Sequence, residues 1–245
     1  MANWPDPRTT SAGFGGASAR AGDVAFDAGL RSYMLSIYNY MASGVLLTGI
    51  VALLFAQSGF AYQVLAGPGP LKYVLMFAPL VFVMVLSFGI QRLQTSTAQM
   101  LYWAYCVVMG LSMASIFLVF TGESIAQTFF AIAAAFAGLS LCGYTTKRDL
   151  SAFGTFLIMG VVGILIASLI NLFIQSTALE LAVSILGVLI FAGLTAYDTQ
   201  RLKSLYADVA GTEFMGKAVV IGALSLYLDF VNMFMFLLRF MGSRE

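Results

Sequence analysis

The stretch at residues 150–179 reads LSAFGTFLIMGVVGILIASLINLFIQSTAL and contains no charged side chain. Between Val161 and Ile170 it is apolar on every side, without the alternation of polar and apolar residues that a membrane β-strand shows. An α-helix needs about 20 apolar residues to cross the hydrocarbon core of a bilayer. This stretch therefore predicts a helix that spans a membrane.

Six further stretches of the same kind lie along the chain. Five of them, 32–71, 73–91, 93–122, 124–146 and 181–197, are uncharged, and 218–238 contains only Asp229. The pattern predicts an all-α integral membrane protein with seven transmembrane helices. The predicted spans are 33–56, 71–91, 99–120, 125–144, 153–174, 181–198 and 218–240.

Composition supports the membrane class. Of 245 residues, 60% are hydrophobic and 9% are charged, whereas soluble proteins have about 45–50% and about 25%. The stretch 9–22 is rich in Gly, Ala, Ser and Thr and has no apolar period, which is typical of disorder. We therefore expect two parts: a disordered cytoplasmic tail at 1–31 and a seven-helix transmembrane domain at 32–245.

Several classes of function are excluded by what the chain lacks. A net charge of +1 does not suit a nucleic-acid partner, because there is no excess of cations to neutralise phosphates. The absence of histidine excludes catalytic Ser-His and Cys-His pairs and histidine-held metals. Cys106 and Cys142 lie in apolar stretches and form no CxxC motif. We expect no cofactor and no enzymatic activity.

Orientation follows from the distribution of Lys and Arg between the two ends of the helices. Nine basic residues fall at one end and three at the other, which predicts a cytoplasmic N-terminus and, with an odd number of spans, a C-terminus outside. A short or re-entrant last helix would return the C-terminus to the cytoplasm. The nine are Arg8, Arg20, Arg31, Arg92, Lys147, Arg148, Arg201, Lys203 and Lys217; the three are Lys72, Arg239 and Arg244.

Three ionisable residues in or at the ends of predicted spans stand out as candidates, because such a side chain costs about 2.5–3.5 kcal/mol at the centre of the membrane. Asp229 lies in the middle of the last span, and Asp198 and Arg92 end the sixth and second spans. Asp198 could instead be an interfacial residue paired with Arg201, and Arg92 an ordinary cytoplasmic anchor. For Asp229, a functional role is the stronger interpretation.

Other polar residues share helix faces with the two aspartates. Ser225, Asp229 and Asn232 fall at i, i+4 and i+7, which makes one polar stripe on an apolar helix. Thr195 and Asp198 share a face at i and i+3. Such a stripe is expected to face the interior of the bundle, so we predict Thr195, Ser225 and Asn232 as groups that support the aspartates.

The two aspartates would titrate as a pair if they lie together. Two neighbouring carboxyl groups rarely both ionise and share a proton over some range of pH, whereas a nearby Arg92 would favour the ionised pair. Gain or loss of one proton could make or break contacts between helices, a physical basis for a pH-sensitive gate. When ionised, Asp198 and Asp229 could also bind a hard cation such as calcium transiently.

Four segments resemble the Bax inhibitor-1 family, and together they extend over nearly everything after the tail. Residues 191–203, FAGLTAYDTQRLK, and 222–242, GALSLYLDFVNMFMFLLRFMG, resemble its signature helices. Residues 145–157, TTKRDLSAFGTFL, resemble the loop between its fourth and fifth helices, and 109–117, MGLSMASIF, resemble its third helix. The chain is identified as a bacterial member of that family.

The resemblance implies a seven-helix bundle with the last helix central, acting as a pH-sensitive calcium leak in the cell inner membrane. Calcium ions and the lipid bilayer would be its partners. In the family, two aspartates that match Asp198 and Asp229 form the pH sensor, and a second-helix arginine matches Arg92. Some members have an acidic residue where this chain has Val81, so an ion-path role of that residue does not carry over.

Two other functions remain open. Some bacterial members of the family restrain a membrane-bound ATP-dependent protease, so this chain could be a modulator of such a protease, with the tail as the contact. An intramembrane aspartyl protease is the remote alternative, because those enzymes also carry aspartates in neighbouring helices. They have GxGD where this chain has LYLD, and they need a later proline than Pro79, the last one here.

Overall fold

The computed structural model describes residues 14–65, 67, 69–90 and 92–243, and side chains from Val24 onward. Within these residues, seven helical segments are long and apolar enough to cross a membrane, which confirms the all-α membrane class. The helices are α1 (Phe14–Gln57), α2 (Phe60–Leu65), α3 (Leu71–Gly89), α4 (Thr95–Met113), α5 (Ile116–Val119), α6 (Gly122–Thr145), α7 (Ser151–Ile174), α8 (Thr177–Val209) and α9 (Met215–Met241). The short α5 continues the span of α4, and α2 lies in the connection between α1 and α3.

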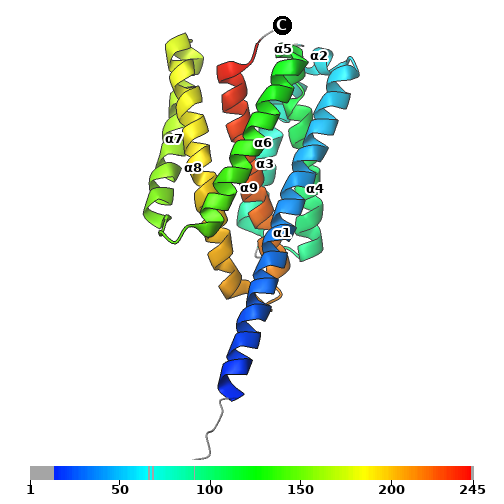
Figure 1. The fold of residues 1–245 in the computed structure, drawn as a ribbon. Coiled ribbons are helices and arrows are strands. Elements are labelled where there is room, and N and C mark those ends of the chain that lie inside the picture. The colour runs from blue at the N-terminus through cyan, green and yellow to red at the C-terminus, as the bar shows by residue number, and fades with distance from the viewer. Residues whose placement is uncertain (1–13, 66, 68, 91, 244–245) are drawn as a thin grey trace, which may run out of the picture.

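Helix α9 is the centre of the bundle, as predicted. In its most apolar part, 72% of the residues are buried inside the protein, against 11–33% in the six other spans. It packs against α1, α4, α6 and α8, and Figure 1 shows it running between them. Because lipid offers no hydrogen bonds, each span satisfies its backbone within its own helix. A polar side chain on the buried part of α9, such as Asp229, is consequently removed from both water and lipid.

The first and last helices have their outer ends at opposite ends of the bundle. Figure 1 shows α1 beginning at the lower end, where the α8–α9 turn also lies, and α9 ending at the upper end. Helix α9 is continuous over 27 residues and is long and apolar enough to cross a membrane. This length does not favour the short or re-entrant last helix that would have brought the C-terminus back to the side of the N-terminus.

Helix α8 is longer than its predicted span of 181–198. It runs for 33 residues to Val209, about 50 Å, which exceeds a hydrocarbon core of about 30 Å. Charges after Asp198 end the apolar run but not the helix, because Leu202, Tyr206 and Val209 are buried at i, i+4 and i+7. The helix therefore continues for three turns beyond Asp198, where the predicted span ends.

The predicted tail also differs from the structure. Residues 1–13 lie outside the described residues, but from Phe14 the chain is already part of α1, so the boundary at 31 falls inside a helix. Packing against the extension of α8 accounts for this. The ring of Tyr206 contacts those of Phe26 and Tyr33, at centroid distances of 5.0 and 5.4 Å. Gly29 leaves the room for the Tyr206 hydroxyl, which a Cβ would overlap.

The loop between α6 and α7 is fastened to α8 by three hydrogen bonds. The Gln200 side chain accepts from the backbone N–H of Leu150 at 2.9 Å and donates to the carbonyl of Arg148 at 2.7 Å. The ammonium of Lys203 donates to the carbonyl of Tyr144 at 2.8 Å. These bonds join α6, α7 and α8 at the end of the bundle where α1 begins.

Candidate functional site

The centre of the candidate site is Asp229 on α9. Its side chain is 4% exposed, and its Oδ2 atom has no hydrogen-bond partner. The position follows from the central place of α9, whose middle faces other helices on nearly every side. A buried polar atom without a partner costs about 1–3 kcal/mol, so this carboxyl group lowers the stability of the bundle and calls for a functional explanation.

Asp198 on α8 lies beside it and is 8% exposed. The Ser225 hydroxyl of α9 donates a hydrogen bond of 2.5 Å to Oδ2 of Asp198, which links the two helices one turn from Asp229. The charge of Asp198 acts on Asp229. The structure thus brings together Asp198, Ser225 and Asp229, as predicted from the sequence. Asp198 is buried between α8 and α9 and does not lie at the membrane–water interface.

Thr195 and Asn232 lie near the aspartates but bond elsewhere. The Thr195 hydroxyl donates to the carbonyl of Phe191 at 2.8 Å, and the Asn232 amide donates to the carbonyl of Leu228 at 2.8 Å. Each bond closes one turn of its own helix, a usual way for a polar side chain to be satisfied in an apolar environment. Neither side chain has a hydrogen bond to an aspartate within the described part of the chain.

Sequence reasoning missed a second polar contact at this level of the bundle. The buried hydroxyls of Thr199 on α8 and Ser140 on α6 are 3.4 Å apart, and Thr199 also donates to the carbonyl of Thr195 at 2.8 Å. The sequence signal that could have identified Thr199 is its position directly after Asp198. Nothing in the sequence pairs Ser140 with it, because the contact depends on how α6 packs on α8.

The structure does not bring Arg92 to the aspartates. Its side chain is exposed in the turn after α3, where its backbone N–H bonds to the carbonyl of Gly89 at 2.9 Å. Among the described residues it has no ion pair or side-chain hydrogen bond. The reason is the peripheral place of α3, which packs mainly on α4. The cation that acts on Asp198 is Arg201, one turn further along α8.

The aspartates do not form part of a larger ligand cluster. No group of three or more His, Cys, Asp or Glu side chains is placed to hold a metal ion within the described residues. Two carboxyl groups and a hydroxyl offer fewer oxygens than the six to eight that calcium takes. Any calcium contact at Asp198 and Asp229 would therefore be a transient one, completed by water.

On another face, α9 is anchored two residues before Asp229. The hydroxyls of Tyr227 and Thr48 share a hydrogen bond of 2.7 Å, and Thr48 also donates to the carbonyl of Cys106 at 3.0 Å. All three residues are buried. This chain of contacts ties α9 to α1 and α4, whereas Ser225 ties it to α8. Asp229 therefore lies in a helix that is held on both sides.

Comparison with known proteins gives this arrangement a family. The model of the family described as "Inhibitor of apoptosis-promoting Bax1" matches residues 30–245. The chain belongs to the Bax inhibitor-1 family. It is 47% identical to an uncharacterized protein of Caulobacter vibrioides over 91% of this chain and 93% of the relative. It is 46% identical to the inner membrane protein YbhL of Escherichia coli, over 89% and 94%.

A third relative has similar coverage. An uncharacterized protein of Rickettsia prowazekii, RP147, is 44% identical over 90% of this chain and 93% of the relative. The family match begins at Leu30 and so includes six spans completely, most of the first, and both aspartates. The resemblance noted in four sequence segments is confirmed over residues 30–245.

Proposed function

We propose that this Bax inhibitor-1 family protein is a pH-sensitive calcium leak whose gate is the pair Asp198 and Asp229. The observation that carries the proposal is the buried carboxyl of Asp229, with an oxygen that has no partner, beside a second buried carboxyl. Two buried carboxyl groups side by side lower the stability of the bundle, so packing does not explain their presence. Intramembrane ionisable residues of this kind mark ion and proton pathways.

The contacts suggest how protons would control the gate. The number of protons that the two carboxyl groups share sets the repulsion between α8 and α9. The hydrogen bond from Ser225 to Asp198 opposes their separation. Because α9 packs against four other helices, a change at this contact is felt across the bundle. Packed helices switch between discrete arrangements, so one proton can open or close a path.

The proposal places the protein in the bacterial inner membrane, as the name of YbhL states for that relative. The N-terminus would be cytoplasmic, because the basic residues cluster at the end of the bundle where α1 begins. In the arrangement described here, Arg201 is the cation that acts on the gate. We propose no cofactor and no catalytic step.

Calcium flux into dye-loaded proteoliposomes tests the proposal directly. Wild type, Asp198→Asn and Asp229→Asn are compared between about pH 5 and pH 8. We expect wild-type flux to change about tenfold or more across this range, the effect of about 1.4 kcal/mol on a gating equilibrium. Both variants should lose the pH dependence, because an amide takes up no proton in this range. Asp208→Asn is the matched control, since Asp208 is exposed on the extension of α8.

Two results would count against the gate. Protein-dependent flux that keeps its pH dependence in both variants would remove the aspartates from the mechanism. Absence of protein-dependent flux at every pH would overturn the leak itself. The protease-modulator hypothesis would then be tested by deleting residues 1–25 and following proteolysis in cells.

A further inference from the structure

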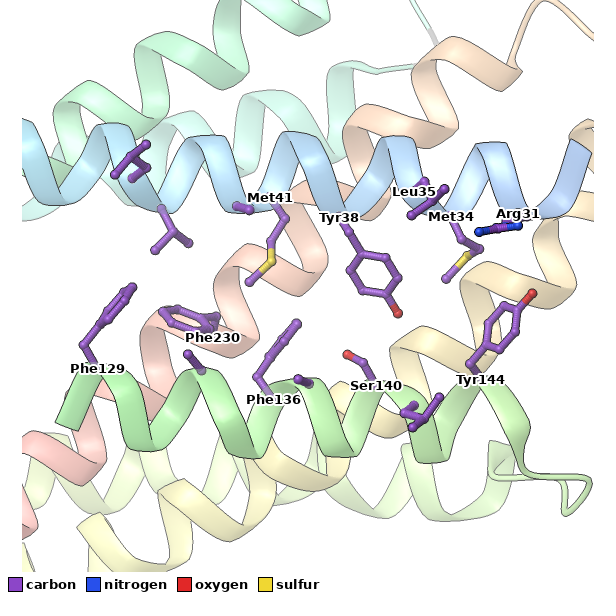
Figure 2. Close-up of a pocket in the computed structure, with 16 residues that line it drawn as sticks. Arg31, Met34, Leu35, Tyr38, Met41, Phe129, Phe136, Ser140, Tyr144 and Phe230 are labelled. Atoms are coloured by element: carbon purple, nitrogen blue, oxygen red, sulfur yellow. The ribbon is translucent and has the colours of Figure 1, made fainter. Parts of the chain in front are cut away.

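A large cavity lies away from the aspartates, between α1 and α6. Both helices pack against α9 but not closely against each other, and the space between them has a volume of about 800 Å³. Figure 2 shows side chains of α1 and α6 facing each other across it, with Phe230 of α9 at its floor. The cavity lies along two membrane-spanning helices, so an occupant would enter from the lipid phase.

The lining changes from polar to apolar along the cavity. Figure 2 shows Arg31 and Tyr144 at one end and Phe129 and Phe230 at the other. The hydroxyls of Tyr38 and Ser140 lie on the polar side of Met41 and Phe136. The gradient matches an amphiphile with one polar end.

A second cavity lies beyond the apolar end. It has a volume of about 320 Å³, shares Val45, Phe129 and Phe230 with the first and continues along the same two helices. Both are lined almost entirely by apolar side chains beyond the polar end. The two cavities together are here called the α1–α6 groove, and an apolar lining of this kind suits a hydrocarbon chain.

The polar end carries positive charge. Arg31 lines the cavity with an exposed side chain, and Asp27, one turn earlier, makes no ion pair with it among the described residues. Lys203 lies over the ring of Tyr144, with its ammonium 4.7 Å from the ring centroid. Arg31 therefore lines this end of the groove, and Lys203 lies beside it through Tyr144, whose ring lines the cavity and whose carbonyl accepts from the Lys203 ammonium.

We propose that the α1–α6 groove binds an anionic phospholipid from the leaflet at the Arg31 end. One acyl chain occupies the cavity, and the phosphate-bearing headgroup lies at Arg31 and Lys203. A zwitterionic lipid has the same hydrocarbon but less negative charge for the cations to attract, so the headgroup gives the selectivity. The proposal does not depend on calcium flux, because it concerns binding at another face of the bundle.

Native mass spectrometry of the full chain in detergent tests this binding. The protein is equilibrated with equal amounts of phosphatidylglycerol and phosphatidylcholine that have identical acyl chains, and each bound lipid is counted. We expect wild type to retain phosphatidylglycerol in excess. Arg31→Gln should lower that excess about fivefold, the usual effect of one basic residue near an anionic lipid surface. Arg148→Gln removes an exposed cation of the neighbouring loop that does not line the cavity, and should leave the excess unchanged.

A second pair of variants separates the groove from the general lipid-facing surface. Ala137→Phe places a ring in the cavity and should reduce retention of both lipids, whereas Ala134→Phe changes an exposed alanine of the same helix outside the lining. A phosphatidylglycerol with a photoreactive acyl chain should cross-link to residues around Tyr38 and Phe136. Equal retention of the two lipids by wild type, or retention unchanged by both Arg31→Gln and Ala137→Phe, would overturn the proposal.

Discussion

Gly143→Ala is expected to lower the free energy of unfolding by roughly 1–3 kcal/mol. A Cβ built at this position lies 2.2 Å from the carbonyl oxygen of Ala196 and 2.9 Å from its carbonyl carbon and Cα. These are backbone atoms of α8, which cannot rotate away as a side chain can. The helices must separate instead, two residues before Asp198. The same movement would disturb the contact between Ser140 and Thr199.

Gly138→Ala is the matched control, because it makes the same chemical change in the same helix. Nothing lies within 4 Å of a Cβ at Gly138, so the substitution should be neutral or stabilise the helix by about 0.5–1 kcal/mol. Because the two substitutions are expected to change the free energy of unfolding in different directions, the comparison separates the effect of packing from that of helix propensity. Cys106, which is fully buried, reports unfolding through a thiol-reactive dye in a Cys142→Ala background.

The expected shift in the unfolding midpoint follows from the size of the chain. A change of 1 kcal/mol moves the midpoint by about 2–4 °C in a protein of this length, so Gly143→Ala should unfold measurably below its Gly138→Ala counterpart. If the two variants unfolded at the same temperature, the close approach of α6 and α8 would not contribute to stability, and the packing described around Asp198 would need revision.

Asp229→Leu is expected to raise the free energy of unfolding by about 1–3 kcal/mol, and Asp229→Asn by less, because the amide still leaves a buried polar group without a partner. Oδ2 of Asp229 is buried without a partner, and an ionised carboxyl there is also repelled by Asp198. The amide keeps the shape but loses the charge, and leucine removes the polar group altogether. The bond between Ser225 and Asp198 does not involve Asp229 and should survive in both variants.

The measurement is the same dye assay in the same Cys142→Ala background. Asp208→Asn and Asp208→Leu are the controls, because Asp208 is an exposed carboxyl group on α8. Surface substitutions of this kind are usually within about 0.5 kcal/mol of wild type. A loss of stability in both Asp229 variants would show that the carboxyl group contributes to packing. A gain of stability, together with loss of the pH dependence of flux, would show that the Asp229 carboxyl group serves function at the expense of stability.

The fold was predictable from the positions of the charges. Uncharged stretches of sufficient length must become spans, because lipid penalises anything else. The ends of helices were less predictable: charges after Asp198 end the apolar run, but water supports a helix as well as lipid does. The extension of α8 is formed by packing of Tyr206 on α1, which no local signal indicates.

The site was predictable only in part, for a related reason. The i, i+4 spacing predicted that Ser225 and Asp229 share the face of α9 that points into the bundle. In the structure, both lie on the side of α9 that packs against α8, near Asp198. Spacing could not say which hydrogen bonds form, so Asn232 bonds its own helix. The position of Arg92 away from the aspartates could not be predicted, because spacing does not reveal that α3 is peripheral. The α1–α6 groove likewise depends on two helices that do not touch.

The fastening of the α6–α7 loop by Gln200 and Lys203 has a mechanical consequence. These bonds join α6, α7 and α8 at one end of the bundle, so a displacement at the proposed gate would not be absorbed between these three helices. It would act on their contacts with α9 and α1, and on the α8–α9 turn, where Gly211 has a φ of 74° that other residues rarely adopt. The α1–α6 groove lies along the same contacts, so a lipid bound there would lie between the three joined helices and the helices that the proposed gate would displace.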